Sequence, residues 1–61
     1  MLTPKEMTKK ILQKFDKEIA RQKAFGILST YDMIKAVVGK DAKQYDLDGF
    51  IGEVQELILE E

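Results

Sequence analysis

The sequence predicts a compact all-α domain of three helices, and three observations support this prediction. Apolar residues recur at helical spacing in three segments, helix-start and helix-stop residues separate those segments, and no segment alternates as a strand would. The 61 residues are enough for a single domain, residues 1–61. A chain this short buries only about 60% of its unfolded surface, so we expect the three apolar helix faces to share one core.

The clearest periodicity lies in residues 47–58, which predict an amphipathic third helix. Its apolar residues are spaced 3, 1, 3, 3 and 1 positions apart and fall on one stripe of a helix. They are Leu47, Phe50, Ile51, Val54, Leu57 and Ile58. Asp46 or Asp48 is expected to cap the start of this helix. Leu59 points about 140° away from the stripe centred on Val54, so we expect it to face outward.

The first helix is predicted to be long, beginning at Pro4 and ending near Ala24. Thr3 and Glu6 have the spacing of a capping box, and proline suits the first helical position because its missing N–H needs no partner there. The apolar residues of this segment recur at helical spacing. They are Met7, Ile11, Leu12, Phe15 and Ile19. The helix would be about 30 Å long, and Gly26 is expected to close it in a left-handed conformation.

A short second helix is predicted between Ser29 and Gly39. The segment 29–32 is a helix-start pattern, and Leu28 is placed to pack against Met33. Four residues supply a short apolar face, namely Met33, Ile34, Val37 and Val38. The connection to the third helix follows, and residues 41–44 are expected to form one helical turn within it.

The composition argues against several classes of function. The chain has no cysteine and no histidine, which removes thiolate nucleophiles, the commonest metal ligand and the usual general base near neutral pH. It also has no glycine-rich phosphate loop. We therefore expect no enzymatic activity, no metal and no cofactor. No apolar run reaches the roughly 18 residues of a membrane span, and the first residues lack a signal-peptide pattern. A cytoplasmic protein without membrane contact is expected.

Two segments resemble known binding motifs, but each lacks residues that the motif requires. Residues 46–51 have the acid-and-glycine pattern of an EF-hand loop. Alignment on Gly49, however, puts Gln44 and Gln55 at the first and twelfth positions, where the loop needs acidic ligands. A helix-turn-helix made of the last two helices would bring an acidic helix without arginine to DNA phosphates. Neither calcium binding nor this mode of DNA binding is predicted.

Charge is distributed unevenly along the chain. Residues 1–40 hold nine Lys or Arg and four Asp or Glu, which is +5; residues 41–61 hold one and seven, which is −6. Lys10, Lys14, Lys17 and Arg21 are spaced to form a basic stripe on the first helix, and Glu53, Glu56 and Glu60 an acidic stripe on the third. The simplest interpretation is that these flanks attract each other where the two helices pack, at about 0–1 kcal/mol per exposed pair.

These patterns favour a small non-catalytic protein-binding module: an adaptor, subunit or inhibitor of another protein, with a homodimer as a further form of the hypothesis. The candidate binding residues are the two charged stripes and Leu59. They are Lys10, Lys14, Lys17, Arg21, Glu53, Glu56, Leu59 and Glu60. Phe25 and Tyr45, at predicted helix boundaries, are expected to be half-exposed and to add apolar surface.

The alternative hypothesis is a nucleic-acid-associated protein that contacts phosphates through the basic stripe of the first helix. Two features weaken it. Glu6 and Glu18 lie within helical reach of the stripe, and the acidic third helix would repel a phosphate backbone.

Overall fold

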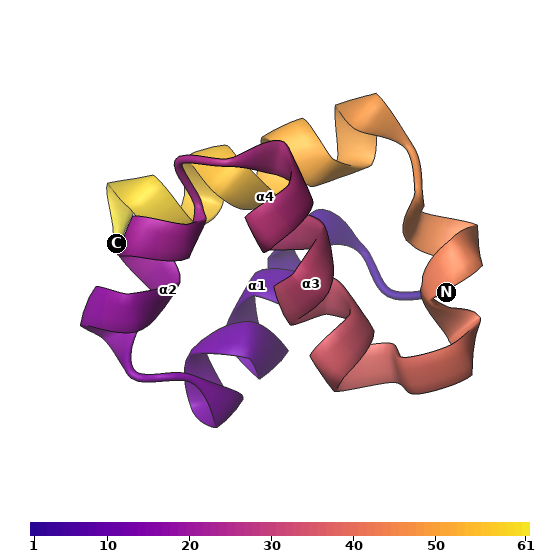
Figure 1. Ribbon diagram of the computed structural model, residues 1–61, viewed down its shortest axis with the longest axis horizontal. Coiled ribbons are helices and arrows are strands. Elements are labelled where there is room, and N and C mark those ends of the chain that lie inside the picture. The colour runs from indigo at the N-terminus through magenta and orange to yellow at the C-terminus, as the bar shows by residue number, and fades with distance from the viewer.

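The computed structural model describes all 61 residues and contains four α-helices, one 3-10 segment and no strand. The elements are α1 (Pro4–Lys14), α2 (Lys17–Lys23), α3 (Ile27–Val38), η1 (Gly39–Tyr45) and α4 (Asp48–Glu60). Helices α1, α3 and α4 pack on one another around one core, and α2 lies at the end of the molecule beside the C-terminus (Figure 1). The predicted all-α class is confirmed. The predicted number of three helices is wrong, because the first helix is divided in two.

The division lies at Phe15 and Asp16. Phe15 takes an extended backbone conformation that ends α1, and the Asp16 carboxylate accepts a hydrogen bond of 2.8 Å from the Glu18 backbone N–H at the start of α2. In one straight helix, Ala20 would point about 220° around the axis from Met7 and so away from the core. The break turns Ala20 inward, and both residues are fully buried.

The size of the molecule gives a second reason for the break. A straight helix from Pro4 to Ala24 would be about 30 Å long at 1.5 Å per residue. The longest extent of the Cα trace is 25 Å. Such a helix would project beyond the other elements and leave its apolar side uncovered, whereas two shorter helices at an angle both lie against the core.

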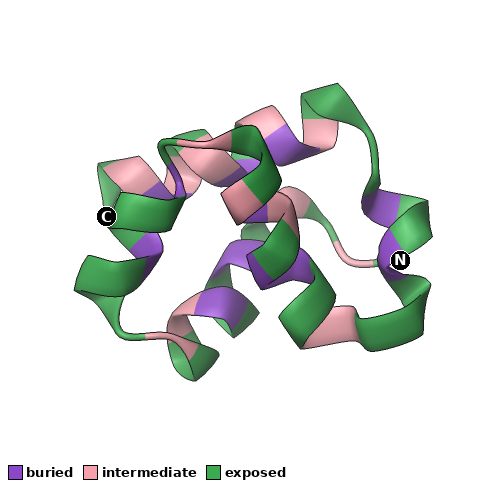
Figure 2. Cartoon of the chain, viewed as in Figure 1, coloured by how far each residue is buried: buried purple, intermediate pink, exposed green.

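The core contains side chains from every helix and from η1. Its members are Met7, Ile11, Ala20, Ala24, Met33, Ile34, Tyr45, Ile51, Val54 and Ile58. The buried stretches lie on the inner sides of the helices, and the outer turns are exposed (Figure 2). Phe15 and Phe50 are half-buried at the edge of the core. Three residues of the predicted apolar stripes lie outside it: Ile19 is 48% and Leu47 55% exposed, and Leu57 is half-buried but does not pack against the core cluster.

The capping box at the start of α1 is confirmed. The Thr3 hydroxyl accepts from the Glu6 backbone N–H at 3.2 Å, and the Glu6 carboxylate accepts from the Thr3 backbone N–H at 2.9 Å. Donation to the Glu6 carboxylate, first by the Thr3 backbone N–H and second by the Thr3 hydroxyl, stabilises the charged form and holds the pKa of Glu6 below its ordinary value of 4.5. The contribution of these bonds to stability is therefore present above that value and is lost as the pH falls through the lowered pKa.

Helix α3 begins earlier than predicted. It starts at Ile27, after Gly26, and the Thr30 hydroxyl does not cap it but donates to the Gly26 carbonyl within its first turn at 2.7 Å. Gly26 has a φ of −113°, so its predicted left-handed role is wrong. The positive φ belongs to Gly39, at 61°, where α3 ends as predicted.

The connection between α3 and α4 is η1, which confirms the helical turn predicted at residues 41–44. Helix α4 starts after Leu47 without a side-chain hydrogen bond, so the predicted aspartate cap is wrong. The expectation that Tyr45 is half-exposed is also wrong, since only 4% of it is exposed. Its hydroxyl accepts a 2.8 Å hydrogen bond from the Leu2 backbone N–H, and its ring lies 5.0 Å from that of Phe50. A partnered hydroxyl allows a tyrosine to be buried.

Candidate functional site

The four predicted basic residues are exposed but do not form one stripe. They are Lys10 and Lys14 on α1 and Lys17 and Arg21 on α2. Because the chain changes direction at Phe15 and Asp16, their 4, 3, 4 spacing no longer places them along a single helix axis. The two on α2 line a shallow hollow together with Asp16 and Glu18. Carboxylates therefore flank half of the predicted basic surface.

The three acidic residues predicted on the last helix are exposed along α4. Glu53, Glu56 and Glu60 line a hollow of about 420 Å³ with Lys5 of α1 and Leu57. Helix α1 packs more extensively against α4 than against any other element, as expected. No ion pair joins the two predicted stripes, since the one ion pair within 4.0 Å in the chain links Lys35 to Asp32 in α3.

Leu59, the remaining predicted site residue, does not face away from the core. It is half-buried and packs against the core cluster. The reason is that α4 is contacted by α1, α2 and α3, so a wide arc of its surface is covered. The apolar stripe in the sequence of a helix does not tell how many other helices pack around it.

The structure points to a different surface, which we call the α2–α3 corner: Phe25, Ile27 and Leu28 together with the neighbouring cations Arg21 and Lys23. Phe25 is 77% exposed, Ile27 51% and Leu28 79%. Single exposed apolar residues are ordinary on protein surfaces. Here three large ones lie within four consecutive positions, and such a concentration of exposed apolar side chains is typical of interaction sites.

The backbone of the corner is held by side chains from α3 and α4. The Gln55 amide of α4 donates to the Ala24 carbonyl at 2.8 Å. The buried Thr30 hydroxyl donates to the Gly26 carbonyl at 2.7 Å and lies 3.4 Å from the Lys23 carbonyl. The Gln55 bond gives a partner to the Ala24 carbonyl at the end of α2, whereas the Gly26 and Lys23 carbonyls also accept hydrogen bonds from backbone N–H groups, from Thr30 at 3.0 Å and from Gly26 at 3.2 Å. The exposed apolar side chains therefore project from a hydrogen-bonded turn.

The corner is basic as well as apolar. Residues 19–28 contain Arg21 and Lys23 and no acidic residue, a local charge of +2, and Arg21 also borders the hollow that contains Asp16 and Glu18. The next acidic residue along the chain, Asp32, pairs with Lys35 at 3.7 Å. An apolar surface bordered by unpaired cations suits a partner that is both apolar and acidic.

Sequence reasoning identified Phe25 as a candidate exposed residue but missed Ile27 and Leu28. It assigned Leu28 to a contact with Met33 on the assumption that the helix begins after it. In a helix that begins at Ile27, Leu28 lies about 140° around the axis from Met33, which is fully buried at 1% exposure. The sequence feature that could have predicted this surface is the concentration of large apolar residues between Phe25 and Leu28.

No group of three or more acidic residues in the chain is arranged to hold a metal ion. None of the helices combines the length and the apolar content needed to cross a bilayer. The chain matches no protein-family model, no curated protein and no solved structure. The fold and the site together define a compact all-α domain of four helices with one exposed apolar and basic corner.

Proposed function

We propose that the protein is a small non-catalytic module that binds another protein through the α2–α3 corner. The observation that supports this is the run of exposed large apolar side chains at Phe25, Ile27 and Leu28. The partner surface is expected to present apolar residues bordered by carboxylates.

Burial of these side chains supplies the free energy of binding. Moving a Phe, Leu or Ile side chain from water into a fully covered site contributes about 1.5–3 kcal/mol. Because the hydrogen bonds from Gln55 and Thr30 already hold the backbone, little conformational entropy is lost when the partner covers the corner. A few such anchors dominate the affinity of many protein interfaces.

Arg21 and Lys23 supply selectivity more than affinity. Cations at the edge of an interface speed the approach of an acidic partner and disfavour basic ones, and their effect falls with ionic strength. Reversal of both charges is therefore expected to slow association and to flatten its salt dependence, with little effect on the dissociation rate.

Site-specific photo-crosslinking tests the proposal. A photoreactive phenylalanine analogue at position 25 is expected to capture a partner in native cells, and the same analogue at position 44, an exposed site on η1, is not. The affinity of the captured protein is then measured by calorimetry against the double variant Phe25→Ser, Leu28→Ser. A loss of about 100-fold is expected, corresponding to about 2.7 kcal/mol.

The matched control is Leu47→Ser, which removes an exposed leucine at the start of α4. It is expected to leave the affinity unchanged. Equal affinities for the wild type and the corner double variant would rule out the corner as the binding surface.

The nucleic-acid alternative makes a separate prediction. Four exposed cations on α1 and α2 would retain the protein on duplex DNA, and reversal of Lys10, Lys14, Lys17 and Arg21 would abolish the retention. The protein-binding proposal expects no retention at physiological salt, because Asp16 and Glu18 lie beside the cations of α2.

A further inference from the structure

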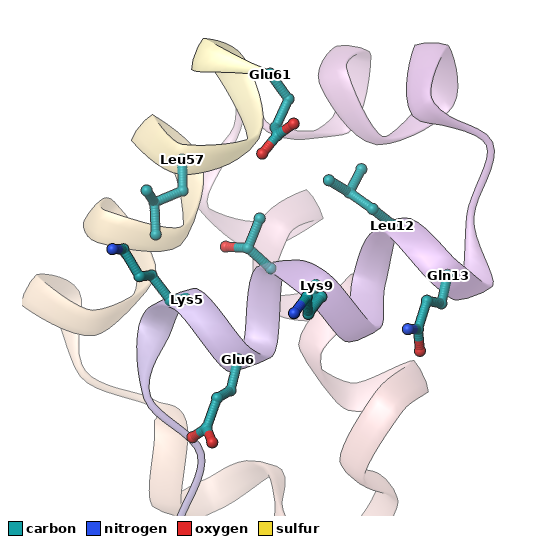
Figure 3. A pocket seen from close by; sticks show the side chains of 8 residues that line it. Lys5, Glu6, Lys9, Leu12, Gln13, Leu57 and Glu61 are labelled. Carbon is teal, nitrogen blue, oxygen red and sulfur yellow. The ribbon is translucent and has the colours of Figure 1, made fainter.

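The largest hollow on the molecule is a groove between α1 and α4 (Figure 3). Its volume is about 570 Å³, and the half-buried Leu12 and Leu57 are its apolar lining residues. Leu57 and Glu61 point from α4 toward α1, and Leu12 points from α1 toward the C-terminal end of α4. Glu6 and Gln13, in contrast, point away from α4. The groove is open and has room for large apolar side chains.

The groove continues into the hollow lined by the acidic residues of α4, since Lys5 and Leu57 line both. We call the combined surface the α1–α4 seam. Apart from Glu6, which points away from α4, its charged residues are Lys5, Lys9, Glu53, Glu56, Glu60 and Glu61, two cations against four carboxylates, or −2. The seam is therefore a concave surface that combines two leucines with an excess of carboxylates.

The seam has the properties that the α2–α3 corner requires of a partner. The corner has three exposed apolar side chains and carries +2, whereas the seam is hollow, is lined in part by two leucines and carries −2. The two surfaces share no residue. We infer that the partner of the corner is a second copy of this chain, whose seam receives Phe25 and Leu28. This inference rests on the proposal that the corner is a binding surface.

The geometry determines the kind of assembly. A two-fold dimer needs one patch that pairs with itself, whereas here the corner of one copy contacts a different surface on the next. Such a head-to-tail contact leaves a free corner at one end and a free seam at the other. It grows into chains unless the rotation between copies closes a ring.

Sedimentation velocity over a series of protein concentrations tests the inference. The average mass of the wild type is expected to rise with concentration past that of two copies, and to fall as salt screens the attraction between corner and seam. The corner variant, Phe25→Ser with Leu28→Ser, and the seam variant, Glu56→Lys with Glu60→Lys, are each expected to stay monomeric. Leu47→Ser is expected to assemble as the wild type does. Thermal melts by circular dichroism verify that each variant is folded.

A mixture of the two variants gives the sharpest result. The corner variant keeps an intact seam and the seam variant an intact corner, so the mixture is expected to form one-to-one dimers that do not grow. A wild type that stays monomeric at every concentration, or assembly that neither variant weakens, overturns the inference. If the chain is monomeric but the captured partner still needs the corner, this inference fails and the proposed function stands. If the corner variant changes neither association, both fail.

Discussion

The two segments that connect α3 to its neighbours each contain one aromatic residue, which is buried in one segment and exposed in the other. At the end of α3, η1 carries Tyr45 into the core, where 4% of it remains exposed. At the start of α3, the corner leaves Phe25 77% exposed. The more polar aromatic residue is buried and the purely apolar one faces water, the reverse of what transfer free energies favour.

A difference in order between the two connections does not explain this difference in exposure. Tyr45 is fixed by the Leu2 backbone N–H, and the corner by Gln55 and Thr30. Each turn thus has one hydrogen bond from a distant part of the chain, from Leu2 to Tyr45 and from Gln55 to Ala24, and the corner has a local one from Thr30 to Gly26. The apolar side chains at the corner are therefore exposed because hydrogen bonds fix the direction of the backbone that carries them. A fixed, exposed apolar surface suits contact with other molecules.

Replacement of the buried aromatic is expected to have the largest effect. Tyr45→Ala removes a core side chain and should cost about 3–5 kcal/mol of unfolding free energy. Small domains rarely have more than about 3–5 kcal/mol in total, so this variant is expected to be largely unfolded by circular dichroism. Tyr45→Phe retains the ring and should cost only about 0.5–1.5 kcal/mol, the contribution of the hydrogen bond to Leu2. A native melt for Tyr45→Ala would contradict the placement of Tyr45 in the core.

The entry into η1 is expected to be the next most sensitive point. Gly39 has a φ of 61° and a ψ of −126°, a backbone conformation that residues other than glycine rarely adopt. A Cβ added at this position would meet no other atom within 4 Å. Gly39→Ala should therefore cost about 1–3 kcal/mol through backbone strain alone. Gly52→Ala is the matched control. It lies within α4 with equal free space, and denaturant titration should show a gain of about 0.5–1 kcal/mol.

Removal of the bond that holds the corner sharpens the comparison further. Gln55→Leu deletes the donor to the Ala24 carbonyl and should lower the unfolding free energy by about 1–3 kcal/mol, because that carbonyl loses its partner. Amide hydrogen exchange at residues 25–27 should also accelerate relative to the core helices. Gln44→Leu, on the exposed side of η1, should change neither quantity. Unchanged exchange in Gln55→Leu would show that the corner does not depend on this bond.

The exposed apolar residues themselves are expected to matter least for folding. The double variant Phe25→Ser, Leu28→Ser should shift the unfolding free energy by no more than about 0.5 kcal/mol per site, because both side chains are already in water. The difference between the unfolding free energies lost in this variant and in Tyr45→Ala directly measures how unequally the two connections contribute to folding. A large loss of stability in the double variant would mean that the corner packs onto the domain in solution.

Much of the helical pattern was predictable because it depends on near neighbours in the chain. The spacing from Phe50 to Ile58 indicates the buried side of α4, and the Thr3–Glu6 pair marks the start of α1. The candidate site was less predictable. The exposure of Phe25 was anticipated in part, but that of Leu28 depends on where α3 begins, which the Ser29–Asp32 pattern misplaced. Leu59 was misjudged because the number of helices around α4 cannot be read from α4 itself.

By itself the sequence determined that the chain is helical, which residues begin α1, and that one side of the last helix is buried. These features follow from hydrogen bonds and side-chain spacing within a few residues. Only the tertiary structure decided that the chain turns at Phe15 and Asp16, that Tyr45 is buried, and that Phe25, Ile27 and Leu28 face water. Each of these depends on the limited room around a core shared by segments far apart in the chain, and that room is a property of the whole fold.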